Sequence, residues 1–154
     1  MKALTIWQPW AQLLATGTKS IETRSWGTRY RGPILIHAAK VDHQYIVLRY
    51  PHESFQYFEE AEAIYKDFPL GAIIGQANLA ECIQMDQGYC DRMKEQNPEE
   101  YAFGNYEPGR YAWVMKDAVL FDKPIPVKGR QGLWNWEDDA NEEKRPLGPG
   151  TAHH

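Results

Sequence analysis

The sequence predicts an α+β fold, a small mixed β-barrel with flanking helices. Short stretches rich in β-branched and aromatic residues recur along the chain, at 33–38, 71–84 and 110–121 among others. One early segment, 9–17, has the apolar spacing of a short helix. The chain has 154 residues, of which 43% are hydrophobic and 25% charged, and this suits one globular domain.

The first helix is expected between Pro9 and Gly17. Pro9 favours a helix start, because the N–H that it lacks would have no partner there. Trp10, Leu13 and Leu14 have the spacing of one apolar face. Gly17 can end the helix in a left-handed conformation. A helix this short needs packing against the rest of the fold to be stable.

Strands are expected on both sides of this helix and again late in the chain. The predicted strands are 2–7, 19–26, 33–38, 71–84 and 110–121, with an edge strand beginning at 125–127. Within 71–84, Glu81 shares its parity with Ile73, Ala77 and Leu79, so its carboxylate is expected to face inward unless the strand ends or bulges first.

The connecting segments are expected to be helices and loops. Asp42 can cap a helix that stops at Pro51, and Ser54 can cap a second one. Residues 86–109 are polar and aromatic, which predicts a long loop with a helical turn. We expect residues 1–136 to form a single domain and residues 137–154 to form a polar tail.

Charge and composition narrow the classes of function. The net charge of −4 argues against general coating of nucleic acid, yet residues 1–40 carry six Lys and Arg against one Glu. Such a basic segment beside six Trp and nine Tyr is compatible with a small anionic or base-containing ligand. No apolar run reaches the roughly 18 residues of a membrane span, and the N-terminus lacks the pattern of a secretory signal. We therefore expect no membrane partner. Cys82 and Cys90 form no CxxC pair, so we expect both to be free thiols in the cytoplasm.

The densest polar cluster is Gly17-Thr18-Lys19-Ser20-Ile21-Glu22-Thr23-Arg24. Glu22, Arg24 and Trp26 alternate on one side of the predicted strand, and Lys19 lies where the loop becomes the strand. Lys offers a point charge, Glu an acceptor or a base, and Arg a planar fork. Spacing alone is equally compatible with a surface ion-pair strip.

This cluster resembles the motif of the ASCH domain family, G-x-K-x-x-E-x-R, through Gly17, Lys19, Glu22 and Arg24. The surrounding Trp7-Gln8-Pro9-Trp10 and Gly129-Arg130-Gln131-Gly132-Leu133-Trp134 are similar to the stand-alone bacterial and phage members. The likeness covers roughly residues 2–136. It implies a PUA-like fold, here a small PUA-like mixed β-barrel with flanking helices, whose cleft is lined by the motif. Such folds are associated with RNA and with modified nucleobases.

The resemblance also implies an activity. Some small ASCH proteins are amidohydrolases that remove the acyl group from N4-acetylcytidine. In the small bacterial type a Thr, proposed as the nucleophile, stands where this chain has Glu22. The expected function is therefore hydrolysis of N4-acylated cytidine with Glu22 as general base, Lys19 as electrophile or proton shuttle, and Arg24 orienting the acyl oxygen or Glu22. The alternatives are a non-catalytic RNA or modified-base binding module and a ribonuclease that uses the same cleft.

Further residues are candidates for the same cleft. Glu81 would be a second catalytic carboxylate or a clamp for Lys19. The residues expected to bind a pyrimidine nucleoside or an RNA base are Trp7, Gln8, Arg24, Trp26, His37, Arg130, Gln131 and Trp134. His37 ends a buried strand, where a hydrogen-bonded core residue is the competing interpretation. The histidines are scattered without metal-ligand spacing, so we expect no metal and no cofactor.

Overall fold

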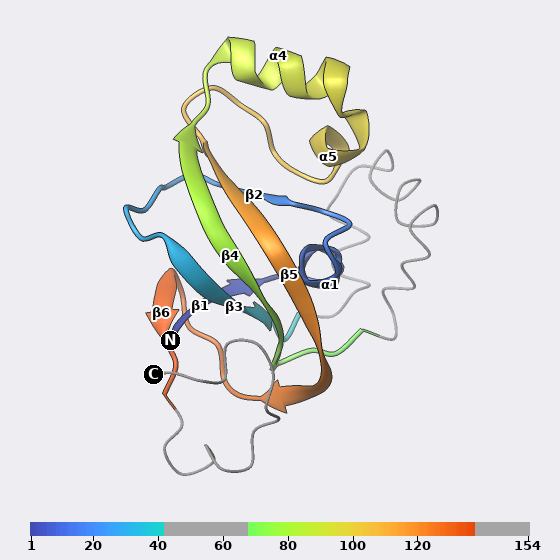
Figure 1. Ribbon diagram of the computed structural model, residues 1–154, viewed down its shortest axis with the longest axis vertical. Coiled ribbons are helices and arrows are strands. Elements are labelled where there is room, and N and C mark those ends of the chain that lie inside the picture. Colours follow the sequence, from blue (N-terminus) through green and yellow to red (C-terminus); the bar gives the residue numbers. More distant parts are fainter. Residues whose placement is uncertain (42–67, 138–154) are drawn as a thin grey trace.

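The computed structural model describes residues 1–41 and 68–137. Within these ranges six strands form one sheet in the order β2-β5-β4-β3-β1-β6. The elements are β1 (Lys2–Ile6), α1 (Trp10–Thr16), β2 (Ile21–Arg24), β3 (Gly32–Ala38), β4 (Ala72–Gln84), α4 (Gln87–Gln96), α5 (Pro98–Ala102), β5 (Tyr111–Pro126) and β6 (Leu133–Asn135). The long strands β4 and β5 curve, so that the sheet forms a half-barrel with few helices (Figure 1). The predicted α+β class and PUA-like architecture are confirmed.

The sheet is mixed. β1 and β3 run parallel, with Thr5 opposite His37, whereas the other neighbouring strands are antiparallel. Parallel strands need a crossover connection, and here this connection contains both α1 and β2. β2 lies at one edge of the sheet, while β1 lies next to the opposite edge. The crossover therefore carries the polar cluster of residues 17–24 back to the open side of the half-barrel.

The helix α1 fills the inner side of this half-barrel. Its buried residues pack against the inward side chains of the central strands, among them Leu4, Ile34, Ile36 and Ile74. At its end Gly17 has a φ of 81° and donates its N–H to the Leu14 carbonyl, which confirms the predicted left-handed cap. This packing supplies the tertiary support that a seven-residue helix requires.

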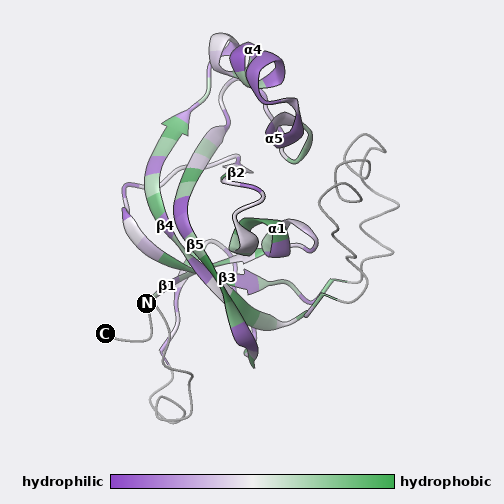
Figure 2. Ribbon diagram, turned by 45° about the vertical axis from the view of Figure 1, so that its right-hand side comes forward, coloured by the Kyte–Doolittle hydropathy of each residue, from purple (hydrophilic) through white to green (hydrophobic). Residues whose placement is uncertain are grey.

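The opposite face of the same strands has its own apolar cluster. Ala3, Leu35 and Ile73 alternate with the inward residues and pack with Trp134 and Trp136. Figure 2 shows hydrophobic and hydrophilic residues alternating along β4 and β5. Both faces of the sheet are thus partly covered, and the parity of a residue decides which cluster it joins.

Some sequence predictions require correction. The predicted strand 19–26 is shorter, from Ile21 to Arg24, and the two late strands form one continuous β5. Residues 86–109 contain two helices, because Asp86 caps α4 and Asn97 caps α5 with their side chains. The helices expected to begin at 42 and 54 lie outside the described residues, as does the predicted tail from 138 onward. In 1–41 and 68–137, no helix is long and apolar enough to cross a membrane.

Gly75 on β4 provides a test of how closely α1 packs on the sheet. A Cβ added there would lie 2.5 Å from the Val119 carbonyl oxygen and 3.0 Å from the Ala15 Cβ. We expect Gly75→Ala to lower the free energy of unfolding by about 2 kcal/mol, measured by urea denaturation, because overpacking forces backbone shifts. The control is Gly88→Ala in α4, where alanine is the better helix former and an added Cβ would meet the flexible end of Arg92 at 3.1 Å and the Asp86 Oδ1 at an ordinary contact distance of 3.4 Å. Equal stability of the two variants would contradict this packing.

Candidate functional site

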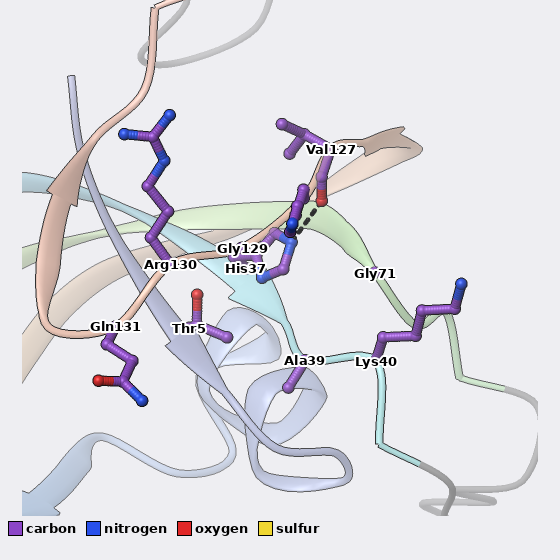
Figure 3. Close-up of a pocket in the computed structure, with 10 residues that line it drawn as sticks. Thr5, His37, Ala39, Lys40, Gly71, Val127, Gly129, Arg130 and Gln131 are labelled. Carbon is purple, nitrogen blue, oxygen red and sulfur yellow. Dashed lines mark hydrogen bonds between the residues drawn. The ribbon is translucent and has the colours of Figure 1, made fainter.

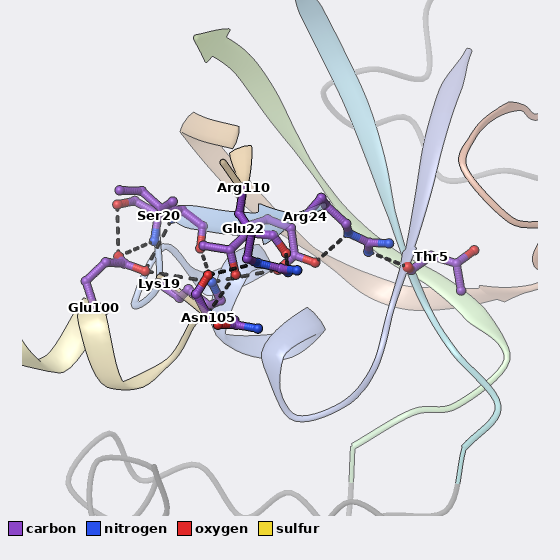
Figure 4. A network of polar contacts seen from close by, with 10 residues as sticks. Thr5, Lys19, Ser20, Glu22, Arg24, Glu100, Asn105 and Arg110 are labelled. Atoms are coloured by element: carbon purple, nitrogen blue, oxygen red, sulfur yellow. Dashed lines mark hydrogen bonds and ion pairs between the residues drawn. The ribbon is translucent and has the colours of Figure 1, made fainter. Parts of the chain in front are cut away.

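Lys19 is the centre of a buried ion network. Its side chain is only 1% exposed, and its ammonium donates a hydrogen bond to the Ile21 carbonyl. The Lys19 Nζ lies 3.8 Å from Glu22 Oε1 and 3.8 Å from Glu100 Oε2 (Figure 4). The interpretation of the motif as a surface ion-pair strip is therefore wrong. A buried ammonium is tolerated because two carboxylates and a carbonyl surround it.

Glu22 and Arg24 extend this network to β1. The Arg24 Nε donates to Glu22 Oε2 at 3.0 Å, and the Arg24 Nη2 donates to the Thr5 carbonyl at 2.8 Å. Both side chains point to one side of β2, as the alternation predicts. β6 pairs with β1 only over Lys2–Leu4, so Thr5 lies beyond the end of that pairing. Arg24 thus connects two strands that are far apart in the order of the sheet.

Glu100 is the member of the network that sequence reasoning missed. This residue is 5% exposed, and its Oε1 accepts hydrogen bonds from the Ser20 N–H at 2.8 Å and the Ser20 hydroxyl at 3.1 Å. The available signal was Asn97-Pro98-Glu99-Glu100, since an Asn cap, a Pro at the first position and a Glu at the third are typical of a helix start.

Glu81 does not join this network. Its side chain is exposed, and the register of β4 with β5 shifts between Leu79 and Glu81. A bulge inserts an extra residue and reverses the faces of those that follow. The expected inward orientation of Glu81 is therefore wrong, and Glu100 occupies the position of the second carboxylate beside Lys19.

Trp7 and Trp26 follow β1 and β2, the two strands that Arg24 connects. Trp7 and Trp26 are partly buried and pack against the inner core. Trp26 meets Trp113 edge-on with ring centroids 4.9 Å apart, and the Trp113 Nε1 donates to the Trp26 carbonyl at 3.1 Å. Each ring keeps part of its surface exposed. Both therefore remain candidates for stacking on a base.

Gln8 has a different role from the expected one. It is fully buried, its Nε2 donates to the Pro69 carbonyl at 3.0 Å, and its Oε1 accepts from the Gln12 N–H at 2.8 Å. Both ends of the amide are thus used to hold the start of α1 and to connect it to Pro69. Gln8, which the sequence predicted to bind a base, is thus engaged within the fold in this structure.

The remaining candidates lie on the other face of the sheet. Thr5 and His37 pair in register and share the parity of Ala3 and Leu35, opposite to the inner core. They line a cavity of about 720 Å³ together with the loop that contains Arg130 and Gln131 (Figure 3). The single cleft expected from the sequence is therefore two sites, on opposite faces of β1 and β3.

Trp134 supports the wall of this cavity. It is 7% exposed, lies edge-on to His37 with centroids 5.6 Å apart, and donates from its Nε1 to the Thr5 Oγ1 at 3.0 Å. The His37 ring makes a second contact, 2.7 Å from its Nε2 to the Val127 carbonyl, and burial lowers the pKa of His37. Trp134, which the sequence predicted to bind a base, packs inside the fold in this structure.

The structure also bears on a metal site and on a reactive thiol. In the described ranges, no group of three or more His, Cys, Asp and Glu residues could hold a metal ion. Cys82 and Cys90 are free, as predicted, and burial raises the pKa of the Cys90 thiol. The Lys19–Glu22–Arg24–Glu100 network, called the motif network below, is thus the principal candidate for chemistry.

A known protein family matches most of the chain, including this site. The family model of the ASCH domain matches residues 4–125. This range includes all four residues of the motif network. The chain belongs to the ASCH domain family. The resemblance carried by Gly17, Lys19, Glu22 and Arg24 is confirmed.

Individual ASCH relatives are distant. The chain is 26% identical over 150 residues to activating signal cointegrator 1 of Homo sapiens and 25% identical to that of Mus musculus. It spans only 23% of the length of these proteins. The crystal structure of ASCH from Zymomonas mobilis matches with a TM-score of 0.56 at 16% identity, covering 93% of this chain and 91% of that one. A mutant of the same protein matches with a TM-score of 0.55 at 17% identity, covering 93% and 94%. At this identity, the structural likeness shows the ASCH fold alone.

Because Lys19 is buried, the contribution of the motif network to the free energy of unfolding can be measured. We expect Glu100→Gln to lower the free energy of unfolding by about 3 kcal/mol, because the variant leaves a buried ammonium with one carboxylate fewer. Urea denaturation would measure this loss. The matched control is Glu99→Gln, its neighbour in the first turn of α5, which should cost less than ~1 kcal/mol. A comparable loss in both variants would reject the pairing of Glu100 with Lys19.

His37 should make stability depend on pH. The folded state resists protonation of His37, whereas the unfolded chain binds a proton near the ordinary value of 6.5. The unfolded state therefore holds more protons below this value, and the free energy of unfolding should fall as the pH is lowered from about 7 to about 5.5. Denaturation at a series of pH values would show this slope in the wild type. The slope should be shallower in His37→Gln, and identical slopes would contradict the assignment.

Proposed function

We propose that the motif network hydrolyses the exocyclic acyl amide of an N4-acylated cytidine. The observation that carries this proposal is the position of Glu22, whose two oxygens face two different cations, Lys19 at 3.8 Å and Arg24 at 3.0 Å. Amide hydrolysis needs a base for the attacking water, a donor for the developing oxyanion and a proton for the leaving amine. Membership in the ASCH family supports the choice of substrate, because some small ASCH proteins are amidohydrolases that act on N4-acetylcytidine.

The reaction divides into two steps. First, Glu22 takes a proton from water as the water oxygen bonds to the acyl carbon, and the carbonyl electron pair moves to the oxygen. Arg24 donates to this oxyanion. The C–N bond then breaks, and the amine leaves with the proton that Glu22 returns. The products are cytidine and the free carboxylic acid, so water and acyl amide are consumed one for one.

The structure changes the roles expected for the cations. Lys19 is 1% exposed, whereas the Arg24 side chain is 23% exposed. Among contacts within the described residues, Arg24 uses its Nε and one Nη2 hydrogen, which leaves further N–H groups for an acyl oxygen. We therefore assign the electrophile to Arg24. Lys19 is a positioning residue that holds Glu22.

The tryptophans provide the contact to the base. Trp7 follows β1, whose Thr5 carbonyl binds Arg24, and Trp26 follows β2, which carries Glu22 and Arg24. An aromatic ring that stacks on a base contributes about 1–3 kcal/mol. Stacking against Trp7 or Trp26 would bring the exocyclic amide of cytosine toward the exposed end of Arg24.

A second function is favoured by the burial of Lys19. Two cations and two carboxylates leave the motif network with no net charge, and its ammonium is enclosed. This arrangement also suits a non-catalytic module in which the tryptophans bind an RNA base or a modified base. In that case the network only positions Arg24, and no bond of the ligand is broken.

Incubation with N4-acetylcytidine followed by chromatography separates the two functions. We expect the wild type to form cytidine and acetate, and Glu22→Gln to lose at least a hundredfold in rate, the usual contribution of a general base. Arg24→Gln should lose a similar factor, because one oxyanion donor contributes about 10²–10³. The matched control is Glu81→Gln, which removes the same charge from an exposed position and should keep full activity.

Each other outcome rejects a stated part of the proposal. Undiminished turnover by Glu22→Gln, with a wild-type circular dichroism spectrum, would exclude Glu22 as the base. Saturable binding of N4-acetylcytidine by the wild type without cytidine formation would favour the binding module. Shortening of an RNA oligonucleotide by the wild type, lost in Glu22→Gln, would instead indicate a ribonuclease.

A further inference from the structure

We propose that the cavity on the outer face of β1 and β3 binds a phosphate group of a nucleotide or of an RNA strand. This cavity, the outer cavity below, has a volume of about 720 Å³ and is lined by Thr5, His37 and the loop 127–131, among others. The cavity shares no side chain with the motif network, which touches it only through the Thr5 backbone carbonyl, so the proposal does not depend on the hydrolysis proposed above. Cavities of this size accommodate small-molecule ligands.

The charge of the outer cavity is the first argument. Three cationic residues line it, Lys40 at the end of β3 and Lys128 and Arg130 in the loop between β5 and β6. None of the described residues that line it is an Asp or a Glu. Two segments thus bring three cationic residues to the lining of one cavity, in a chain whose net charge is −4. Such an arrangement attracts an anion.

His37 gives an independent second argument. It is 1% exposed, and its Nδ1 has no hydrogen-bond partner within the described residues. The Val127 carbonyl can only accept, so the Nε2 at 2.7 Å carries a hydrogen and the neutral ring presents Nδ1 as an acceptor. Figure 3 shows the ring with one nitrogen toward Val127 and the other turned away from it. A buried polar atom without a partner is costly in the empty protein, and a ligand in the cavity can satisfy it.

The chemistry of His37 matches a phosphate. A neutral Nδ1 can accept from the P–OH group of inorganic phosphate or of a phosphate monoester, and a protonated one can donate to an oxygen of a monoester or of an RNA phosphodiester. The groups that face the ring are the Val127 carbonyl, the Trp134 ring and the Thr5 hydroxyl, with the three cations in the same cavity. Since no carboxylate is among them, a bound phosphate anion would be the group that favours a proton on His37. Phosphate binding should therefore strengthen as the pH falls toward 6.

Gly129 brings the cationic loop onto His37. A Cβ at this position would lie 2.5 Å from the His37 Cε1, 2.8 Å from its Nδ1 and 2.8 Å from the Thr5 Oγ1. Any other residue would press into the ring and fill the space beside Nδ1. The absence of a side chain at Gly129 therefore lets the backbone between Lys128 and Arg130 lie directly beside the buried His37 Nδ1.

Isothermal titration calorimetry with inorganic phosphate, cytidine 5′-monophosphate and a single-stranded cytidine hexanucleotide tests this site and its source of phosphate. We expect saturable binding of at least one of these probes. Lys128→Gln should weaken binding roughly tenfold, the effect of losing one charge-assisted hydrogen bond. The matched control is Lys123→Gln, which removes the same charge from an exposed residue of β5 outside the cavity and should bind like the wild type.

Each result of these titrations supports or overturns the proposal. Binding of the monophosphate, lost in Lys128→Gln, identifies a nucleotide site, whereas binding of the hexanucleotide alone identifies the backbone of RNA. Equal weakening in Lys128→Gln and Lys123→Gln, or saturable binding of none of the probes, overturns the proposal. Proton NMR of the His37 ring provides a second readout, since bound phosphate should shift its titration to higher pH in the wild type and not in Gly129→Ala.

Discussion

The contact of Arg24 with the Thr5 carbonyl is the interaction on which the rest of the structure depends. β2 and β1 are separated by three strands in the sheet, and a half-barrel leaves these two strands facing each other without ladder hydrogen bonds. One guanidinium spans this opening, and its second donor fixes Glu22 at 3.0 Å. The same side chain thus closes the fold and orients the carboxylate, because the fork of Arg presents several donors in a rigid plane.

The motif network shows why the polar cluster is buried at all. Replacing a buried ion network with apolar residues is often neutral or stabilising, so the network is weak evidence for a stability role. What it does provide is a fixed geometry, since Lys19, Glu22 and Glu100 come from the loop after α1, from β2 and from α5. Glu100 also holds Ser20 by its backbone and hydroxyl. Because several elements hold its side chains, the network is preorganised. General-base catalysis by Glu22 would require such preorganisation.

The sequence predicted local features well and long-range ones poorly. The helix 9–17 and the alternation of Glu22 with Arg24 follow from spacing within a few residues, and both are confirmed. Glu81 was misplaced because parity counting assumes an unbroken strand, and β4 bulges before it. Glu100 was missed because a five-residue helix is stable only through tertiary contacts that no local pattern reveals.

The misplacement of His37 has a more general cause. Motif segments that are near one another in a family pattern need not share a face, since pairing partners and parity decide the side on which each residue lies. Thr5 contacts both sites, one through its backbone and the other through its side chain. Its carbonyl lies in the plane of the sheet and binds Arg24, while its hydroxyl stands on the outer face beside Trp134 and His37. A strand that separates two polar sites can therefore contribute to both, because backbone and side chain leave it in perpendicular directions.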